Sequence, residues 1–282
     1  MQYEAARSRK SRDRRLFVEL SSVYDVLERY DEALATYDDW LREAPDDAEM
    51  LHEKGLTLLL LERFDEAAAA LARVTVLLPD DLQTQEDLGY AHLRGKRLAD
   101  ADAALTRVLA RERRRPNALR LLAQVRAAEG RTNEAAALLD EALQIDPTDA
   151  RAAQVRARLA QLLGNAKSAL AGYGIVLKQA PDDTGALLGA AGALAVLDRL
   201  DEAASLLARV RAKHPHQPEL RLRDAQLAWR RGDRAALGVL QALAKEQPAN
   251  LEVWREIEGA AARFGEARLV DESRAKQRAL AP

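Results

Sequence analysis

The amino-acid sequence predicts an all-α solenoid built from a series of helical hairpins of equal length. The segment LERYDEA at 27–33 returns as LERFDEA at 61–67, which defines a 34-residue period. A third copy, LDRLDEA at 197–203, lies five of these periods after the first. A fixed period between about 20 and 50 residues indicates stacked repeats, in which each repeat buries its apolar face against its neighbours.

A gapless alignment supports this period. Lines of one period each, of which the first begins at Arg14, align for six lines, and we number the positions within a line as columns. Column 20 is always small and column 24 is always large. The small residues are Ala33, Ala67, Ala101, Ala135, Ala169 and Ala203, and the large ones are Tyr37, Leu71, Leu105, Leu139, Tyr173 and Leu207.

Each line predicts two helices. In the first line Phe17, Leu20 and Tyr24 are three or four residues apart, which places them on one face of a first helix. Ala33 and Tyr37 continue the pattern in a second helix, and polar links such as RGKRLAD and EGRTNE separate the two helices of later lines. A proline near the end of a line, usually followed by Asp, stops the second helix and caps the next one. These prolines are Pro45, Pro79, Pro147, Pro181 and Pro215.

The lines define the domain organisation. We expect seven hairpins over 14–250, starting near residues 14, 48, 82, 116, 150, 184 and 218. The last proline of the seventh line comes one residue early, which implies a deletion near Gly232. Residues 251–282 form a degenerate eighth repeat whose polar second helix caps the stack. Residues 1–13 are basic, and two interpretations stay open: a flexible arm or an extension of the first helix.

Composition excludes several classes of protein. The 43 basic and 45 acidic side chains nearly balance, which argues against a nucleic-acid binder. The chain has no cysteine, its four histidines do not converge, and it lacks a glycine-rich phosphate loop. We therefore expect no enzyme activity, no cofactor and no metal site. The longest apolar run is GALLGAAGALAVL at 185–197, which is shorter than the ~20 residues that a helix needs to span a bilayer.

The pattern resembles the tetratricopeptide repeat. Besides the alanine, the large residue and the terminal proline, column 8 holds the small residues typical of that family, such as Gly55 and Gly89. The resemblance implies a right-handed superhelix whose first helices line a concave groove for a peptide or protein partner. It also implies a scaffold, which we expect to be a monomer rather than a homo-oligomer.

The groove columns 2, 5, 9, 12 and 13 predict the partner-binding residues. In the second and third lines they give an apolar floor with charged edges, in the fourth and fifth a polar and basic stretch, and in the seventh two residue types common at binding hot spots. The first group is His52, Leu56, Leu59, Leu60, Glu86, Tyr90, Leu93 and Arg94, the second is Arg120, Gln124, Gln154 and Arg158, and the third is Trp229 and Arg230.

Two alternatives to this site stay open. The leucines of LTLLLL belong equally well to the core between repeats. Trp229 could equally turn inward and fill the space left by the deletion.

The predicted function is a non-catalytic scaffold for protein interaction. The absence of a signal sequence favours the cytoplasm. One alternative is a periplasmic scaffold for envelope or exopolysaccharide assembly whose signal or anchor has been removed, and another is a regulatory region detached from an enzyme. Of the 43 basic residues, 35 are arginine in an alanine-rich chain, which points to a bacterial source.

Overall fold

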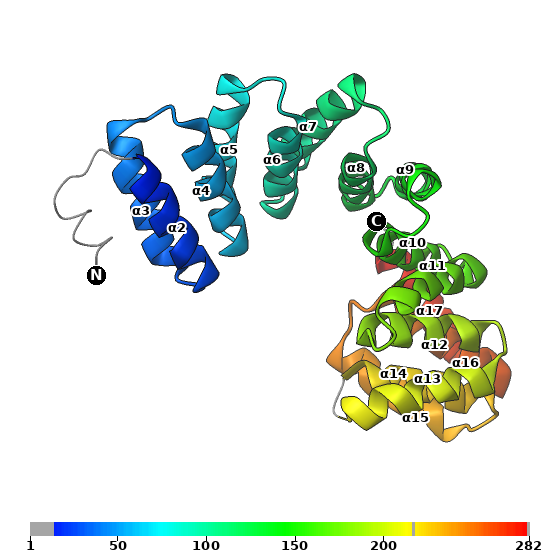
Figure 1. Cartoon of the computed structure of the whole chain (residues 1–282). Coiled ribbons are helices and arrows are strands. Elements are labelled where there is room, and N and C mark those ends of the chain that lie inside the picture. Colours follow the sequence, from blue (N-terminus) through cyan, green and yellow to red (C-terminus); the bar gives the residue numbers. More distant parts are fainter. Residues whose placement is uncertain (1–13, 216–217, 281–282) are drawn as a thin grey trace. The chain divides into compact units, whose positions relative to one another are not determined.

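The computed structural model describes residues 14–215 and 218–280, and within these ranges it contains sixteen α-helices and no strand (Figure 1). The basic segment 1–13 lies outside the described residues. Every line of the alignment forms a hairpin of a first and a second helix. The chain divides into an N-terminal unit, 1–145, and a C-terminal unit, 146–282.

The N-terminal unit stacks four hairpins. Each first helix packs against its own second helix and against the second helix of the preceding hairpin. The first helices are α2 (Arg14–Val26), α4 (Ala48–Leu60), α6 (Leu82–Arg94) and α8 (Pro116–Ala128). The second helices are α3 (Tyr30–Glu43), α5 (Phe64–Leu77), α7 (Leu98–Arg111) and α9 (Thr132–Ile145).

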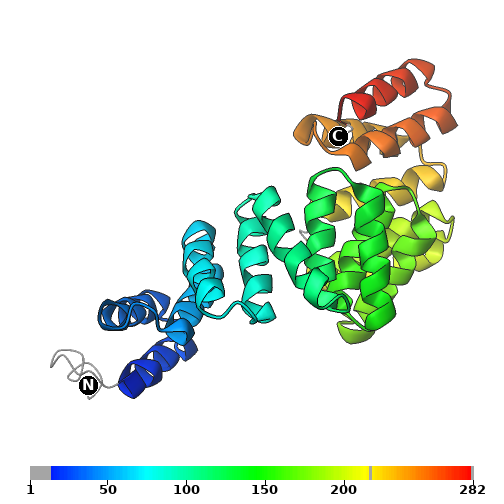
Figure 2. The same ribbon diagram turned by 90° about the horizontal axis from the view of Figure 1, so that it is seen from above.

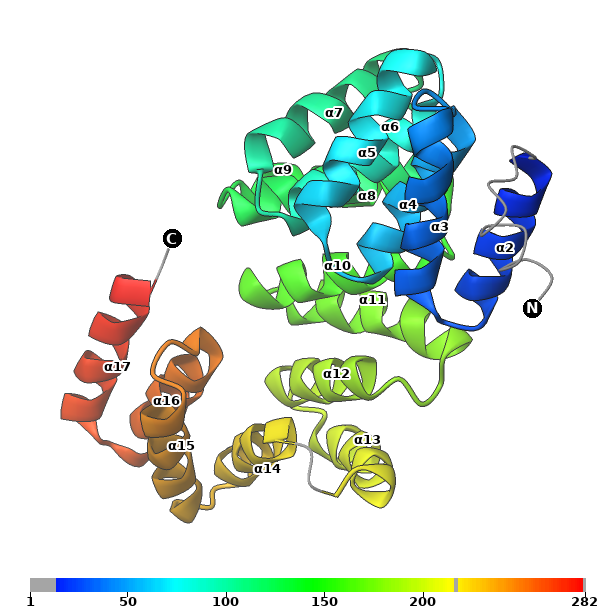
Figure 3. The ribbon, with the colours of Figure 1, turned by 90° about the vertical axis from the view of Figure 1, so that its left-hand side faces the viewer.

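The C-terminal unit also contains four hairpins. Its first helices are α10 (Ala150–Leu162), α12 (Thr184–Val196), α14 (Pro218–Arg230) and α16 (Leu251–Phe264). Its second helices are α11 (Ala166–Gln179), α13 (Leu200–Lys213), α15 (Ala235–Glu246) and α17 (Ala267–Leu280). Figures 2 and 3 show α16 and α17 side by side at the end of the chain. Ser273 is the one buried residue among those described in α17, so this helix leaves a polar face in water.

The hairpin core is built from the small and large columns. All six alanines of column 20 have no exposed surface, and the large residues of column 24 are at most 3% exposed. A Cβ atom added to Gly55 would lie 2.7 Å from Leu71 Cγ, and one added to Gly89 would lie equally close to Leu105 Cγ. Small residues in column 8 therefore let the two helices of a hairpin approach each other, as ridge-into-groove packing requires.

The joints between hairpins are capped by side chains. The acid two positions after the proline accepts backbone N–H groups from the first turn of the next helix. Asp47 accepts from Met50, Asp81 from Gln83 and Thr84, and Asp149 and Asp183 act in the same way on α10 and α12. These bonds satisfy donors that would otherwise have no partner within the helix.

The turns inside the hairpins share one backbone feature. The residue in column 15 adopts a left-handed conformation with φ between 55° and 95° in each of the first seven lines. Glycine takes this position at Gly130, Gly164 and Gly232, whereas the other four turns place a residue with a side chain there. Those residues are Glu28, Glu62, Lys96 and Asp198. L-residues adopt this conformation only at a cost.

An arginine follows this turn residue in five hairpins and pairs with an acid three residues later. Because the arginine precedes the second helix, each pair fixes the start of that helix and neutralises both charges. The pairs are Arg29 with Glu32, Arg63 with Glu66, Arg97 with Asp100, Arg131 with Glu134 and Arg199 with Glu202.

Candidate functional site

Neighbouring first helices of the N-terminal unit are joined by polar contacts. Thr57 Oγ1 of α4 donates to Asp25 Oδ1 of α2 at 3.3 Å. His52 Nε2 of α4 lies 3.2 Å from Asp87 Oδ2 of α6. These bonds place the groove columns of α2, α4 and α6 on one surface. We call this surface the first-helix wall and define it by Asp25, Val26, His52, Leu56, Leu59, Leu60, Tyr90 and Leu93.

The predicted site residues differ in exposure. All of them lie on first helices. Leu60, Arg94 and Arg158 are exposed; His52, Leu56, Leu59, Tyr90, Leu93, Arg120, Gln124, Gln154 and Arg230 are half-buried; and Glu86 and Trp229 are buried. The set is distributed over both units, so only the members within one unit can be placed together.

The apolar part of the wall is partly core and partly surface. Leu59 packs against the buried cluster that extends from α2 to α6, and Tyr90 and Leu93 pack against the buried cluster formed by α7 and α8. Leu60, in contrast, is 66% exposed, and Val26, in the same column of the first line, is 83% exposed. The two interpretations of LTLLLL are thus divided along the segment, because Leu59 supports the core while Leu60 faces water.

Arg94 covers one end of this apolar surface. Its guanidinium carbon lies 4.8 Å from the ring centre of Phe64 and 5.6 Å from that of Tyr90, within the range of cation–π contacts. Arg94 Nη1 also donates to Tyr90 Oη at 2.6 Å, and Nη2 pairs with Glu62 at 3.1 Å. The arginine is therefore already engaged within its own unit, and it shields Tyr90.

His52 adds a positive charge to the wall. The hydrogen bond that His52 donates to Asp87, with a smaller contribution from Glu53, raises the pKa of His52 to about 9. The imidazole is consequently protonated at neutral pH and forms an ion pair with Asp87. A group of this kind holds α4 and α6 together and is not available as a general base.

Glu86 belongs to an internal network rather than to an open groove. Only 1% of the residue is exposed. Asn117 Nδ2 donates to Glu86 Oε2 at 2.5 Å, and Arg115 Nε donates to its other carboxylate oxygen. A buried carboxylate requires such partners, and here they link α6 to α8 and to the residue before α8. The groove columns identify the face of Glu86, but burial removes it from contact with a partner.

Trp229 also turns inward, in line with the second of its two interpretations. It is 7% exposed, and its indole Nε1 donates to Glu256 Oε2 of α16 at 2.8 Å. The guanidinium carbon of Arg230 lies 4.3 Å from the Trp229 ring centre. Burial raises the pKa of the Glu256 carboxyl above its usual range. The pair predicted as a hot spot thus forms part of the packing between α14 and α16.

A second polar chain extends across the C-terminal unit. Arg223 Nη1 of α14 donates to Glu252 Oε1 of α16 at 2.6 Å, and Gln161 Nε2 of α10 donates to the same oxygen at 2.9 Å. Tyr173 Oη in turn donates to Gln161 Oε1 at 2.9 Å. These groups connect three first helices by contacts between their own side chains.

The groove columns include Gln161 in column 12, but the sequence pattern did not mark Asp25 or the acids of α16 as site residues. One signal could have identified Asp25 and Gln161 as partners of a tyrosine. In both lines where column 24 is tyrosine, column 12 is polar, at Asp25 and at Gln161, and the tyrosine hydroxyl donates to that residue. In the four lines with leucine in column 24, column 12 is Leu or Ala.

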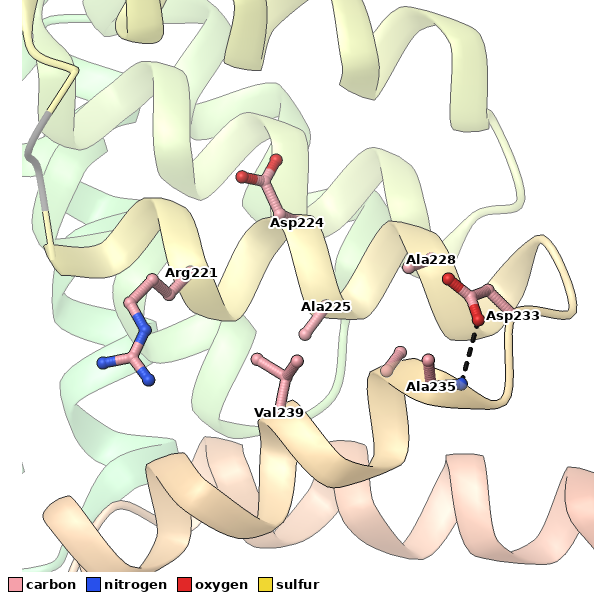
Figure 4. Close-up of a pocket in the computed structure, with 8 residues that line it drawn as sticks. Arg221, Asp224, Ala225, Ala228, Asp233, Ala235 and Val239 are labelled. Atoms are coloured by element: carbon pink, nitrogen blue, oxygen red, sulfur yellow. Dashed lines mark hydrogen bonds between the residues drawn. The ribbon is translucent and has the colours of Figure 1, made fainter.

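A cavity of about 290 Å³ lies between α14 and α15 (Figure 4). Alanines and Val239 form much of its lining, and three charged residues complete it. Each of these has a partner already: Arg221 pairs with Glu246, Asp224 pairs with Arg211, and Asp233 Oδ1 accepts from the backbone N–H of Ala235. The cavity therefore presents no converging free polar groups that would orient a small ligand.

The described residues form neither a metal-binding cluster nor a membrane-spanning helix. Over 14–215 and 218–280, no group of three or more His, Asp or Glu side chains is arranged to hold a metal ion. Over the same residues, no helix combines the length and apolar character that a bilayer crossing needs.

Comparison with known proteins identifies the repeat. Two family models, both described as tetratricopeptide repeat, match the chain. The first matches residues 2–48, 18–81, 52–102 and 86–150, and the second matches residues 126–184 and 164–227. A search of the curated proteins gives no match.

Several solved structures share the fold. PilW, described as a widely conserved type IV pilus biogenesis factor, is 20% identical with a TM-score of 0.65, and the match covers 74% of this chain and 96% of PilW. The pilF protein of Pseudomonas aeruginosa is 15% identical with a TM-score of 0.64, covering 80% of this chain and 100% of pilF. A repeat protein from Parabacteroides merdae is 18% identical with a TM-score of 0.58, covering 83% and 93%. At these identities the likeness shows the architecture of the chain.

Proposed function

Because this chain belongs to the tetratricopeptide repeat family, we propose that it is a non-catalytic scaffold that binds a peptide or protein partner on the first-helix wall of its N-terminal unit. The observation that carries the proposal is the exposure of large apolar side chains there. Leu60 is 66% exposed, and Val26, in the same column of the preceding hairpin, is 83% exposed. Half-buried Leu56 lies one turn before Leu60 on α4. Apolar side chains grouped at one surface favour a partner that covers them.

The remaining predicted residues have supporting roles in this proposal. His52 and Arg94 hold the edges of the wall through their ion pairs, and Leu59, Tyr90 and Leu93 anchor the wall to the buried clusters beneath it. Arg120 and Gln124 of α8 remain proposed polar contacts in the N-terminal unit, and Gln154 and Arg158 remain proposed polar contacts of the C-terminal unit taken by itself. Arg120 Nη2 donates to Asn117 Oδ1, which orients its guanidinium.

The test compares two charge substitutions at exposed positions. The double variant Leu56→Glu with Leu60→Glu places charges on the wall, and Val76→Glu places a charge on second helix α5 at a residue that is 80% exposed. Affinity capture from native lysate, read by quantitative mass spectrometry, should lose a specific protein with the double variant and retain it with Val76→Glu. Equal capture by all three proteins would refute the proposed surface.

An alternative is a scaffold for envelope or exopolysaccharide assembly in the periplasm. PilW is described as a pilus biogenesis factor, and its architecture is shared by this chain. Fractionation of cells that express the native gene separates this alternative from the cytoplasmic location that we propose.

The third candidate, a regulatory region of an enzyme, predicts that the captured protein is an enzyme whose rate changes on binding. Light scattering tests the proposed monomeric state.

A further inference from the structure

The carboxylate of Asp25 is contacted by hydroxyl groups and by no basic side chain among the described residues. It is half-buried on α2, where it accepts a hydrogen bond from Tyr37 Oη at 2.6 Å and one from Thr57 Oγ1 at 3.3 Å. Among the residues that the structure describes, no Lys, Arg or His pairs with it. An ionised carboxylate offers about four acceptor positions, so two hydroxyl donors leave it capacity for a further donor. A partly buried negative charge is also better stabilised by a cation than by neutral hydroxyls.

The cations near this end of the N-terminal unit are already paired with other acids. Arg29 pairs with Glu32 at 2.6 Å, Arg63 pairs with Glu66 at 2.7 Å, and Arg94 pairs with Glu62 at 3.1 Å. Among residues 14–215 and 218–280, the Asp25 carboxylate is thus left without a counterion.

The C-terminal unit contains the same hydrogen bond between column 24 and column 12, with a further partner added to it. Tyr173 donates to Gln161 as Tyr37 donates to Asp25, and the partners are twelve positions apart in both cases. Gln161, however, also donates a hydrogen bond to Glu252 of α16. The same carboxylate accepts a hydrogen bond from Arg223 of α14. A charged side chain from a distant segment therefore docks on the column 12 residue in this unit. The described residues supply no such contact to Asp25.

Apolar residues lie next to Asp25 and to its partner Thr57 along α2 and α4. Val26 follows it in the chain and is 83% exposed. Thr57, which donates to Asp25, is followed one helical turn later by Leu60 and preceded directly by Leu56. A ligand for this surface must combine a positive charge with aliphatic groups.

We propose that the first-helix wall of the N-terminal unit binds a protein segment in which a lysine or arginine lies between aliphatic side chains. The basic side chain pairs with Asp25, and the aliphatic side chains cover Val26, Leu56 and Leu60. This proposal rests on the proposed scaffold function and specifies the chemistry of the partner. The sign of the charge disfavours an anionic membrane or a nucleic acid, since Asp25 and the exposed Glu28 beside it repel phosphate groups.

A peptide series tests the proposal on the unaltered protein. Three fluorescein-labelled peptides, SGLLKLLSG, SGLLQLLSG and SGLLELLSG, differ only in the central charge. Fluorescence anisotropy at low salt should give a Kd about tenfold lower for the lysine peptide than for the glutamine peptide, and the weakest binding for the glutamate peptide. Added salt should reduce the difference between the lysine and glutamine peptides.

The variant Asp25→Asn tests whether Asp25 is the residue that pairs with the lysine of the peptide. Asparagine keeps an oxygen that can accept from Tyr37, so we expect a folded protein whose Kd for the lysine peptide rises about tenfold, while the Kd for the glutamine peptide stays unchanged. The matched control is Asp271→Asn, which removes the same charge from exposed α17. This control should bind all three peptides as the unaltered protein does.

The possible outcomes separate this proposal from the scaffold function. Equal affinities for the three peptides, or no binding of any of them, would overturn the proposed chemistry. If capture of the native partner still depends on Leu56 and Leu60 in that case, the scaffold function stands and only the role of Asp25 fails. Should Asp25→Asn not fold, the order of the three peptides on the unaltered protein still decides the matter.

Discussion

Tyr173 donates a hydrogen bond from its phenolic oxygen to Gln161 Oε1 at 2.9 Å. This bond joins the second helix of a hairpin, α11, to groove column 12 of its first helix, α10. The same relation occurs between Tyr37 and Asp25 at 2.6 Å. The two pairs differ in the acceptor, which is an amide oxygen in Gln161 and a carboxylate oxygen in Asp25. This difference leads to the first prediction.

Removing the tyrosine hydroxyls should cost unequal amounts of stability. Tyr173→Phe loses a bond between neutral groups, and the free energy of unfolding should fall by about 1 kcal/mol. Tyr37→Phe loses a bond to a carboxylate, and the loss should be about 2 kcal/mol. Urea unfolding followed by circular dichroism measures both values at neutral pH. A larger loss for Tyr173→Phe would contradict the charge-based reason.

Ala101 should not tolerate a larger side chain. It has no exposed surface and lies on α7 in the column where all six aligned lines have alanine. Ala101→Leu should lower the free energy of unfolding by ~1–3 kcal/mol, because the added atoms force the helices apart. Ala99→Leu, at an exposed position of the same helix, is the control and should change stability little. Equal thermal melting of the two variants would show that the core has room at residue 101.

Glycine should stabilise the third hairpin turn. Lys96 has a φ of 60°, in the left-handed region where a Cβ atom is unfavourable. Lys96→Gly removes that cost but adds freedom to the unfolded chain, so we expect a net gain of about 0.5 kcal/mol in the free energy of unfolding. Lys96→Ala keeps the Cβ atom and should bring no gain. The melting temperatures of the two variants give the comparison, and a gain with alanine as large as that with glycine would exclude relief of backbone strain.

Stability should depend on pH through His52. Its pKa is about 9 in the folded protein, against an ordinary value near 6.5. A raised folded pKa stabilises the protein fully below the unfolded value, and this contribution is lost as the pH rises from 6.5 through 9. We expect a loss of about 1 kcal/mol over this window, since 23% of the side chain remains exposed to water.

His52→Gln provides the control for this pH dependence. Glutamine keeps a donor toward Asp87 but does not titrate, so the difference in unfolding free energy between the two proteins should shrink as the pH rises. Urea titrations at pH values from 6 to 9.5 measure this difference. A difference that stays constant over this range would show that the ion pair with Asp87 contributes nothing to stability.

Much of the fold could be predicted because a repeat array depends on short-range contacts. Ala33 and Tyr37 recur at the same spacing as Ala67 and Leu71, and each hairpin packs on its neighbours in the same way within a unit. The family, the helices and the buried columns follow from that repetition. The candidate site was predicted only as a set of columns, and whether its exposed members bind a partner stays a prediction.

The sequence by itself determined the period, the hairpins and the face on which each residue lies, since helical spacing within a line is a local property. Only the tertiary structure decided which members of that face meet water. Trp229 and Leu60 occupy neighbouring groove columns, yet Trp229 is buried and donates to Glu256, whereas Leu60 is exposed. Gln161 meets Glu252 across 91 residues of chain, a contact that no column predicts. The physical reason is that a column specifies a direction from the helix axis, whereas burial depends on the side chains that other helices bring to the same place.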